Sequence, residues 1–167
     1  MLFRSSGALN VVFTPPAGCN ALPEKTMASA FRGVPVKYAC VTPGEGTAVF
    51  VTVSEMENPE KGFPDFERGF KDGVREVSPA VQFKRRTVSL NGTKWVGLRY
   101  TTQAAGGSAV SNDAYMISWA GYAVLFNFFT PAPKYEARRA ALEESAKSIG
   151  LSISAFAPAE TPGPKNN

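Results

Sequence analysis

The spacing of hydrophobic residues along the chain predicts two pairs of strands. Residues 34–54 and 81–102 are rich in β-branched and aromatic side chains, which is typical of strands. A turn sequence interrupts each region: Thr42-Pro43-Gly44-Glu45-Gly46 in the first and Asn91-Gly92 in the second. Asn-Gly favours a two-residue type I′ turn, because both positions of that turn need positive φ. We therefore expect two hairpins, 34–41 with 47–54 and 81–90 with 93–102.

A helical period separates the two hairpins. Over residues 58–79 apolar side chains recur every three or four positions, and charged residues fill the gaps. The apolar positions are Phe63, Phe66, Phe70, Val74 and Val77. Pro59 and Pro64 suit a helix entry and Ser78-Pro79 suits its exit, because proline is tolerated in the first turn of a helix. The pattern predicts an amphipathic helix over 64–77 that packs on a sheet.

The C-terminal third combines a doubly apolar strand with a second helix. Residues 122–129 are apolar on both alternating faces, and Asn127 is their only polar side chain. Both faces of such a strand have to be covered. The following segment, 134–149, carries an apolar stripe and is expected to end at Gly150 as its C-terminal cap. The stripe consists of Tyr135, Leu142, Ala146 and Ile149. The expected architecture is an antiparallel sheet with a helix on each face.

Other segments give weaker signals. Residues 8–13 read as a strand, 20–33 are ambiguous with a short helix as one reading, and Tyr115, Ile117 and Trp119 alternate as in a strand. Residues 104–112, with Gly106-Gly107-Ser108, are expected to form a flexible loop. The proline-rich end, 158–167, is expected to be a solvated tail after one domain spanning 1–157.

Charge and hydropathy narrow the class of protein. The 167 residues carry 18 basic and 14 acidic side chains, a net charge of +4 spread along the chain. Nucleic-acid binders usually concentrate positive charge more strongly, so a nucleic-acid partner is not expected. No apolar run approaches the roughly 18 residues of a membrane span.

The two cysteines, Cys19 and Cys40, leave two readings open. They are either bridged in an exported protein or two buried thiols in a cytoplasmic one. We expect the bridge, with Cα atoms within about 7 Å, because the segment between them is turn-rich. The N-terminal apolar stretch is too short for a signal sequence, so a periplasmic or secreted location is expected only if a signal was removed.

The segment YAVLFNFFTPAPKYEARRAALEESAKSI resembles the PsbP-like superfamily. Its recognisable parts are an aromatic strand, a Thr-Pro turn, a Tyr-Glu helix and a closing Lys-Ser-Ile, and the similarity covers roughly 49–151. The resemblance implies an α+β fold, an antiparallel sheet flanked by helices as an α/β/α sandwich. It also implies a non-catalytic accessory or adaptor protein that binds a protein partner, since members of this group are mostly binding proteins.

The absence of histidine removes most familiar catalytic sites. Serine–histidine and cysteine–histidine pairs and nearly all common zinc sites need imidazole, so no metal or cofactor is expected. A carboxylate pair for glycoside hydrolysis remains a less favoured hypothesis, with Glu55 and either Glu57 or Glu60 as candidates. A solvated rim before a helix is the simpler interpretation of these glutamates.

The Asn91-Gly92 turn places four candidate binding residues on one face of the hairpin. A two-residue turn pairs Lys84 with Arg99, Arg86 with Gly97 and Val88 with Trp95. Lys84, Arg86, Trp95 and Arg99 would then form a shallow basic and aromatic patch for an acidic protein partner. The alternative is an ordinary solvated face, or cations lying over helices at the sheet margin.

Two further expectations concern this hairpin. If the patch is exposed, reversing Arg86 and Arg99 to glutamate should weaken partner binding and leave the fold intact. Arg85 falls among the apolar residues of the opposite face, where it either extends past the sheet edge, marks a bulge or is a buried functional cation. A second functional hypothesis is a carrier of a small apolar or anionic ligand in a cleft between sheet and helix.

Overall fold

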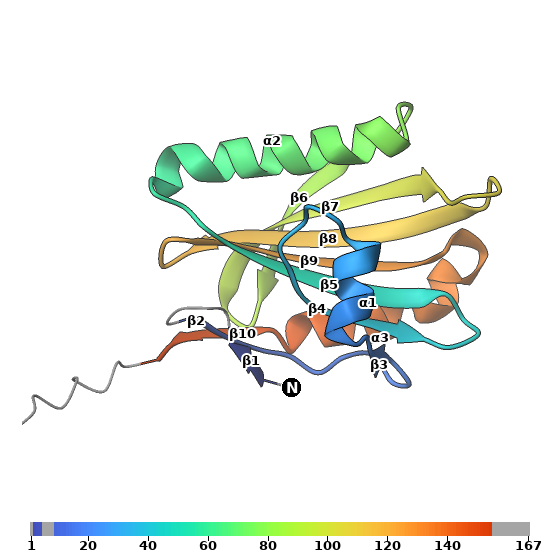
Figure 1. Cartoon of the computed structure of the whole chain (residues 1–167), viewed down its shortest axis with the longest axis horizontal. Helices are drawn as coiled ribbons and strands as arrows, with labels where there is room; N and C mark the ends of the chain where they lie inside the picture. Colours follow the sequence, from blue (N-terminus) through green and yellow to red (C-terminus); the bar gives the residue numbers. More distant parts are fainter. Residues whose placement is uncertain (1, 5–8, 155–167) are drawn as a thin grey trace, which may run out of the picture.

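A seven-stranded antiparallel sheet forms the middle layer of the molecule (Figure 1). The computed structural model describes residues 2–4 and 9–154. The strands are β3 (Asn20–Ala21), β4 (Val36–Thr42), β5 (Thr47–Glu55), β6 (Lys84–Leu90), β7 (Thr93–Gln103), β8 (Ala109–Trp119) and β9 (Tyr122–Pro131). Their order is β3-β4-β5-β9-β8-β7-β6, so β6 is one edge of the sheet.

Helix α2 (Pro59–Val77) covers one face of this sheet (Figure 1). Asn58 caps its first turn by accepting a hydrogen bond from the Lys61 amide at 3.4 Å. The apolar stripe of the helix packs on side chains of β7, β8 and β9, namely Leu98, Tyr100, Met116 and Leu125. The short helix α1 (Glu24–Ala30) lies near β4, and Phe31 just after it contacts Phe50 on the same face. Val77 is an exception to the predicted stripe, because it is 75% exposed at the helix end.

Helix α3 (Tyr135–Lys147) and a small sheet cover the opposite face (Figure 1). A short 3₁₀ turn, Ala132–Lys134, leads into α3. The small sheet consists of β1 (Leu2–Arg4), β2 (Leu9–Val12) and β10 (Gly150–Ile153), in the order β1-β2-β10. Side chains from α3, β2 and the large sheet form one buried cluster here. The predicted stripe of Tyr135, Leu142, Ala146 and Ile149 is buried, as expected.

Both predicted hairpins are confirmed, and two local expectations are wrong. Asn91 and Gly92 have φ values of 48° and 78°, as a type I′ turn requires. The expected loop over 104–112 is shorter, because β8 already begins at Ala109. Gly150 begins β10, and Ser148 is the C-cap of α3. The predicted tail at 158–167 lies outside the described residues.

Asn127, the one polar side chain in the apolar strand, belongs to a buried hydrogen-bonded chain. Tyr100 donates to Asn127 Oδ1 at 2.8 Å, and Asn127 Nδ2 donates to Asn112 Oδ1 at 3.2 Å. Asn112 in turn donates to Thr102 Oγ1 at 3.2 Å. Burial of a polar side chain is tolerated when its groups are paired in this way.

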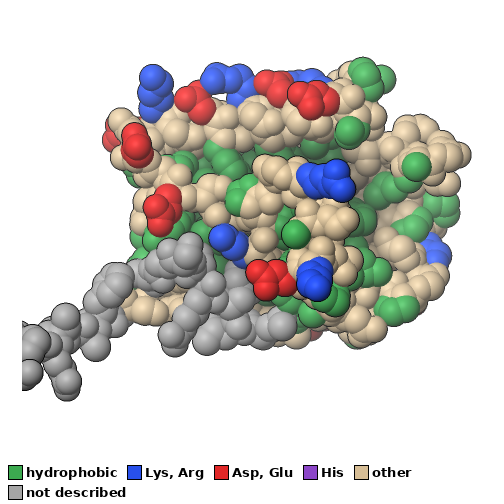
Figure 2. Space-filling model, viewed as in Figure 1, with side chains coloured by type: hydrophobic (Ala, Val, Ile, Leu, Met, Phe, Trp, Pro, Cys, Tyr) green, Lys and Arg blue, Asp and Glu red, His purple; other side chains and the backbone are tan. Residues whose placement is uncertain are grey.

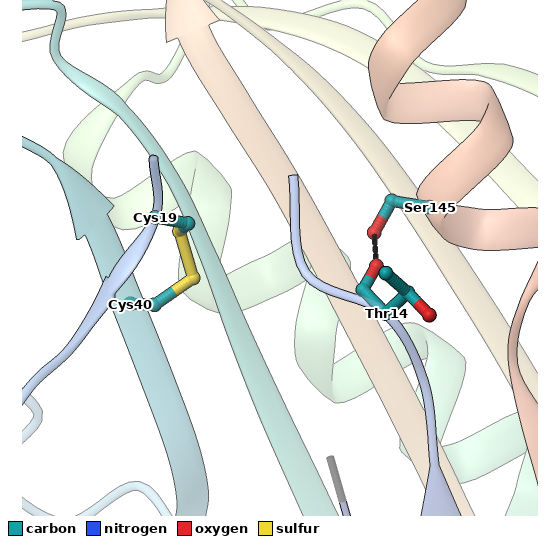
Figure 3. The surroundings of a disulfide bond; sticks show 4 residues. All are labelled: Thr14, Cys19, Cys40 and Ser145. Carbon is teal, nitrogen blue, oxygen red and sulfur yellow. Dashed lines mark hydrogen bonds between the residues drawn. A yellow bond between two sulfur atoms is a disulfide. The ribbon is translucent and has the colours of Figure 1, made fainter. Parts of the chain in front are cut away.

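The predicted disulfide between Cys19 and Cys40 is confirmed, with the two Cα atoms 5.4 Å apart. The bridge joins Cys19, which directly precedes the two-residue strand β3, to Cys40 in strand β4 (Figure 3). Nearby, Ser145 of α3 donates a hydrogen bond to the Thr14 carbonyl at 2.6 Å (Figure 3). The N-terminal segment is therefore tied both to the large sheet and to α3. None of the helices in the described part of the chain has the length and hydropathy of a membrane span.

Candidate functional site

The predicted register of the β6–β7 hairpin is confirmed. Lys84 faces Arg99, Arg86 faces Gly97 and Val88 faces Trp95. Close packing explains why position 97 is a glycine, because a Cβ at this position would lie 3.1 Å from Arg86 Cγ. The Arg86 side chain thus crosses the hairpin over Gly97 toward β8.

The expectation of an exposed aromatic patch is wrong for Trp95. This side chain is only 2% exposed and its ring packs edge-on against Phe126, with centroids 6.2 Å apart. The physical reason is that this face of the sheet is covered by α3 and the small sheet, so an indole pointing there enters the core. Of the four residues, only Lys84 is exposed, at the open end of the hairpin, and Arg86 and Arg99 are half-buried.

Arg86 and Arg99 converge on Asp113, a residue that the sequence analysis did not identify. Asp113 lies in β8 and is 2% exposed. Its carboxylate accepts hydrogen bonds from Arg99 Nε at 2.8 Å and from the Tyr135 hydroxyl at 2.6 Å, and Arg86 Nη2 lies 3.6 Å away. A buried carboxylate is tolerated only when paired and hydrogen-bonded. These four residues, which we call the Asp113 cluster, join β6, β7, β8 and α3.

The Asp113 cluster also sets the ionisation of its neighbours. Burial raises the pKa of Tyr135, and its hydrogen bond to Asp113 raises it further. Burial, with a smaller effect of the Asp113 charge, raises the pKa of Tyr115 to about 12. Burial is the largest single effect on Arg99 and lowers its pKa, but the hydrogen bond to Asp113 and the charge of that carboxylate together outweigh burial and raise the pKa of the guanidinium. Both phenols therefore stay protonated at neutral pH and the arginine stays charged, as a fixed structural cluster requires.

On the other face of the sheet, Arg85 forms an ion pair with α2. Its Nε and Nη2 donate to the two carboxylate oxygens of Glu67 at 2.8 and 3.2 Å, and Lys71 Nζ donates to Glu67 at 2.8 Å. The Arg85 side chain is 51% exposed on the edge strand. Of the three readings of Arg85, extension past the sheet edge is therefore correct.

The ion pair between Arg85 and Glu67 predicts how the stability of the protein depends on pH. Its pKa is lowered chiefly by the Arg85 hydrogen bond, so its stabilising effect is present above the unfolded-state pKa and is lost as pH falls through the folded-state pKa. We expect Glu67→Gln to lower the free energy of unfolding by about 1 to 3 kcal/mol at pH 7. The difference between the two proteins should shrink as pH falls from about 5 toward 3. Urea unfolding at both ends of this range measures it, and a difference independent of pH would contradict the assignment.

A cavity of about 590 Å³ opens where the hairpin ends. It lies between residues 77–82, which comprise the end of α2 and the segment after it, and the last residues of β7. Val77, Val81 and Tyr100 give it an apolar part, and Lys84 and Arg99 give it a basic part. No acidic residue in the described part of the chain lines it. Two of the three basic residues of the expected patch, Lys84 and Arg99, thus contribute to a recess at the sheet edge, whereas Arg86 does not.

The candidate carboxylates lie elsewhere, at the start of α2. Glu55, Glu57 and Glu60 are all exposed, and the first two line a recess of about 420 Å³ together with Lys61 and Asp65. General acid catalysis by a carboxyl group usually depends on an environment that raises its pKa, such as burial in an apolar pocket. These exposed side chains have the solvated-rim arrangement given above as the simpler interpretation.

Several solved structures share this architecture and align with most of this chain. The PsbP protein CyanoP of Synechocystis sp. PCC 6803 aligns with a TM-score of 0.64 and 14% identity over 89% of this chain and 95% of its own. LpqN of Mycobacterium tuberculosis, described as involved in cell envelope biogenesis, aligns with a TM-score of 0.60 and 14% identity over 89% and 86%. The Ran-binding protein Mog1p of Saccharomyces cerevisiae gives 0.52 and 14% over 86% and 89%.

These similarities confirm the predicted PsbP-like fold, an α+β sandwich of an antiparallel sheet between helices. No protein-family model and no curated protein matches the sequence. At 14% identity the comparison shows the fold alone.

Proposed function

We propose that this protein is a non-catalytic accessory protein that binds a protein partner at the end of the β6–β7 hairpin. The observation that carries the proposal is the recess beside β7, which combines an apolar wall with Lys84 and Arg99. Interfaces bind through apolar contacts at their centre and use charge to guide encounter and register. A basic rim of this kind fits an acidic partner surface.

The similar structures support a binding role. Mog1p is described as a Ran-binding protein, and CyanoP is a PsbP protein. The fold therefore occurs in at least one protein whose described role is to bind another protein. A shared fold does not by itself imply a shared partner, so the partner of this chain follows from its own surface.

The roles of the predicted binding residues are revised accordingly. Lys84 is exposed and forms no ion pair within the described residues, so its charge is available to a partner. Arg86 and Arg99 hold Asp113, so reversing both to glutamate would disrupt a buried cluster as well as a surface. The expectation that this double reversal leaves the fold intact is therefore withdrawn, and Lys84 is the residue that tests binding.

We also propose an oxidising compartment, periplasmic or secreted, as the location. The bridge between Cys19 and Cys40 is the supporting feature, because disulfides persist mainly outside the reducing cytoplasm. LpqN, one of the similar structures, is described as involved in cell envelope biogenesis.

Site-specific photo-crosslinking in the native host tests the binding surface. A photoreactive phenylalanine at Gln82, which is exposed and lines the recess, should give one discrete cross-linked species. The matched control is Arg68, whose side chain is 68% exposed on α2, where acidic and basic side chains alternate (Figure 2). Lys84→Glu should strongly reduce the product at position 82. No product at 82, or the same product at 82 and 68, would contradict the proposal.

A second candidate function is suggested by the same recess. Its volume of about 590 Å³ falls within the range of small-molecule sites, about 300 to 1,000 Å³, and its apolar and basic lining suits a small anionic ligand. Native mass spectrometry of protein purified from the host distinguishes the two. A bound small molecule that disappears in Lys84→Glu would favour a ligand carrier over a protein-binding accessory.

A further inference from the structure

Strand β7 extends beyond its partner at the edge of the large sheet. The β6–β7 pairing runs from Leu90 and Thr93 to Lys84 and Arg99, and residues 100–103 of β7 continue without β6. On its other side β7 remains paired with β8 as far as Gln103 and Ala109. The last residues of β7 therefore have no strand partner on this side, and this edge borders the 590 Å³ recess.

The backbone of Thr101 points into this recess. In an antiparallel sheet the amide groups of successive residues point alternately to the two neighbouring strands. The Ala104 N–H donates to the Ser108 carbonyl on the β8 side at 2.7 Å, and the Gln103 N–H donates to Ser78 Oγ on the opposite side at 3.3 Å. Thr101 has the same parity as Gln103, so its N–H and C=O also point away from β8. Within the described residues no hydrogen-bond partner faces them.

The two walls beside Thr101 differ in chemistry. On the α2 side the recess has an apolar wall, which includes Val77, and this side chain is 75% exposed. On the other face lie Lys84 and Arg99, and Arg99 is already paired with Asp113. Lys84 therefore supplies the unpaired positive charge. A strand lying beside Thr101 would direct alternate side chains to these two walls.

We propose that the partner inserts a short extended segment beside Thr101 as an added strand, with acidic and apolar side chains in alternation. This inference rests on the proposed function and specifies its chemistry. The segment accepts a hydrogen bond from the Thr101 N–H and donates one to the Thr101 carbonyl, as in other cases of strand addition. Its apolar side chain covers the exposed Val77, and its carboxylate faces Lys84. Symmetric pairing of this edge with the same edge of a second copy does not match the charge, since it would bring two basic recesses together.

A peptide titration tests the recognition chemistry. The probe is the acetylated, amidated pentapeptide Val-Glu-Val-Glu-Val, added to the ¹⁵N-labelled protein and followed by NMR. We expect saturable shifts of the Thr101 and Gln103 amides. The same peptide with lysine in place of glutamate, and the peptide methylated at all its backbone amides, should each bind about tenfold more weakly or worse.

Variants of the protein distinguish the contribution of the Thr101 backbone to peptide binding from that of the Lys84 charge. Thr101→Pro removes the N–H that faces the recess and should weaken peptide binding about tenfold, whereas Thr101→Val keeps the N–H and should bind as the parent does. Proline is tolerated where a strand edge has no ladder partner, and the ¹⁵N spectrum checks folding. Lys84→Glu should weaken binding, and Lys94→Glu, at the far end of the hairpin, should not. If Thr101→Pro does not fold, the backbone-methylated peptide alone decides.

Several results would overturn the inference. Equal binding of the parent peptide and the methylated peptide, or of parent protein and folded Thr101→Pro, would exclude strand addition. Octanoate binding at Thr101 more tightly than the peptide would assign the recess to a small carboxylate, and concentration-dependent self-association through Thr101 would assign it to a second copy.

If the cross-link from Gln82 persists in Thr101→Pro, the proposed function stands and strand addition is wrong. If no position yields a cross-link, the proposed function fails independently of the peptide result.

Discussion

Asp113→Asn is expected to lower the free energy of unfolding by about 3 to 5 kcal/mol. The substitution keeps the size of the side chain but removes the charge that Arg86 and Arg99 face, at a position only 2% exposed. The guanidinium groups of Arg86 and Arg99, whose side chains are 37% and 27% exposed, then keep only Glu143, 3.8 Å from Arg99 Nη2, as a nearby counter-charge. Loss of one partner of a buried ion pair is costly because the charge left behind is poorly solvated. Urea unfolding at pH 7 measures the change.

A surface aspartate provides the matched control for this substitution. Asp72 pairs with Arg75 on α2, and its side chain is 58% exposed. Asp72→Asn should change stability by no more than about 0.5 kcal/mol, since exposed ion pairs contribute little. Combining Asp113→Asn with Arg99→Gln should cost clearly less than the sum of the single changes. Additive losses, or a loss at Asp113 as small as that at Asp72, would show that the cluster does not act as a unit.

The elements that the sequence predicted correctly are those with a strong local signal. Asn91-Gly92 determines both the turn and the register of β6 against β7, so the facing of Lys84 with Arg99 followed from two residues. The apolar strand β9 required cover on both faces, and α2 and α3 provide it. In these cases the periodicity and the tertiary contacts agree, which is why local reasoning was sufficient.

The candidate site was harder to predict because it depends on what covers each face. The register placed Trp95 beside three cations, but only the position of α3 and the small sheet shows that this face is buried. Strands β1, β2 and β10 come from the two ends of the chain, and their pairing leaves no local pattern. These long-range contacts determine whether Trp95 is buried or exposed, and the sequence near Trp95 gives no sign of them.

The burial of Asp113 could have been predicted from the alternation of residues along β8, but the sequence analysis did not use this pattern. It alternates with Tyr115 and Ile117 on β8, so the period of two places its carboxylate on a core face. The register of β7 with β8 pairs it directly with Arg99, but the sequence analysis treated residues 104–112 as a loop and began the strand at Tyr115. An error of a few residues in one strand boundary therefore concealed the buried partner of two arginines. A second boundary error concealed the open edge at Thr101, because the sequence analysis began the first strand of this hairpin at residue 81, whereas β6 begins at Lys84.

The second large effect is expected at the disulfide. Replacing both Cys19 and Cys40 by serine should lower the free energy of unfolding by about 3 kcal/mol, because the bridge closes a loop of 21 residues and restricts the unfolded chain. The folded state offers little compensation, since β3 has two residues and pairs with β4 only through Asn20 and Ala21. The Leu22 N–H, bonded to the Ala39 carbonyl at 2.9 Å, is the next contact along this edge.

Urea unfolding of three samples tests the disulfide prediction: the oxidised parent, the parent with dithiothreitol, and the double serine variant. The last two should both fall below the first, and the serine variant should fall further, because Cys40 is fully buried and a serine hydroxyl there loses its hydrogen bonds to water. Hydrogen exchange should show where the fold loosens, with faster exchange of the Leu22 amide in the serine variant and little change at the Asp113 cluster, which lies on other strands. Equal stability of all three samples would show that the edge at β3 holds without its bridge. A loss of protection that extends to β8 would instead make the bridge part of the global folding unit.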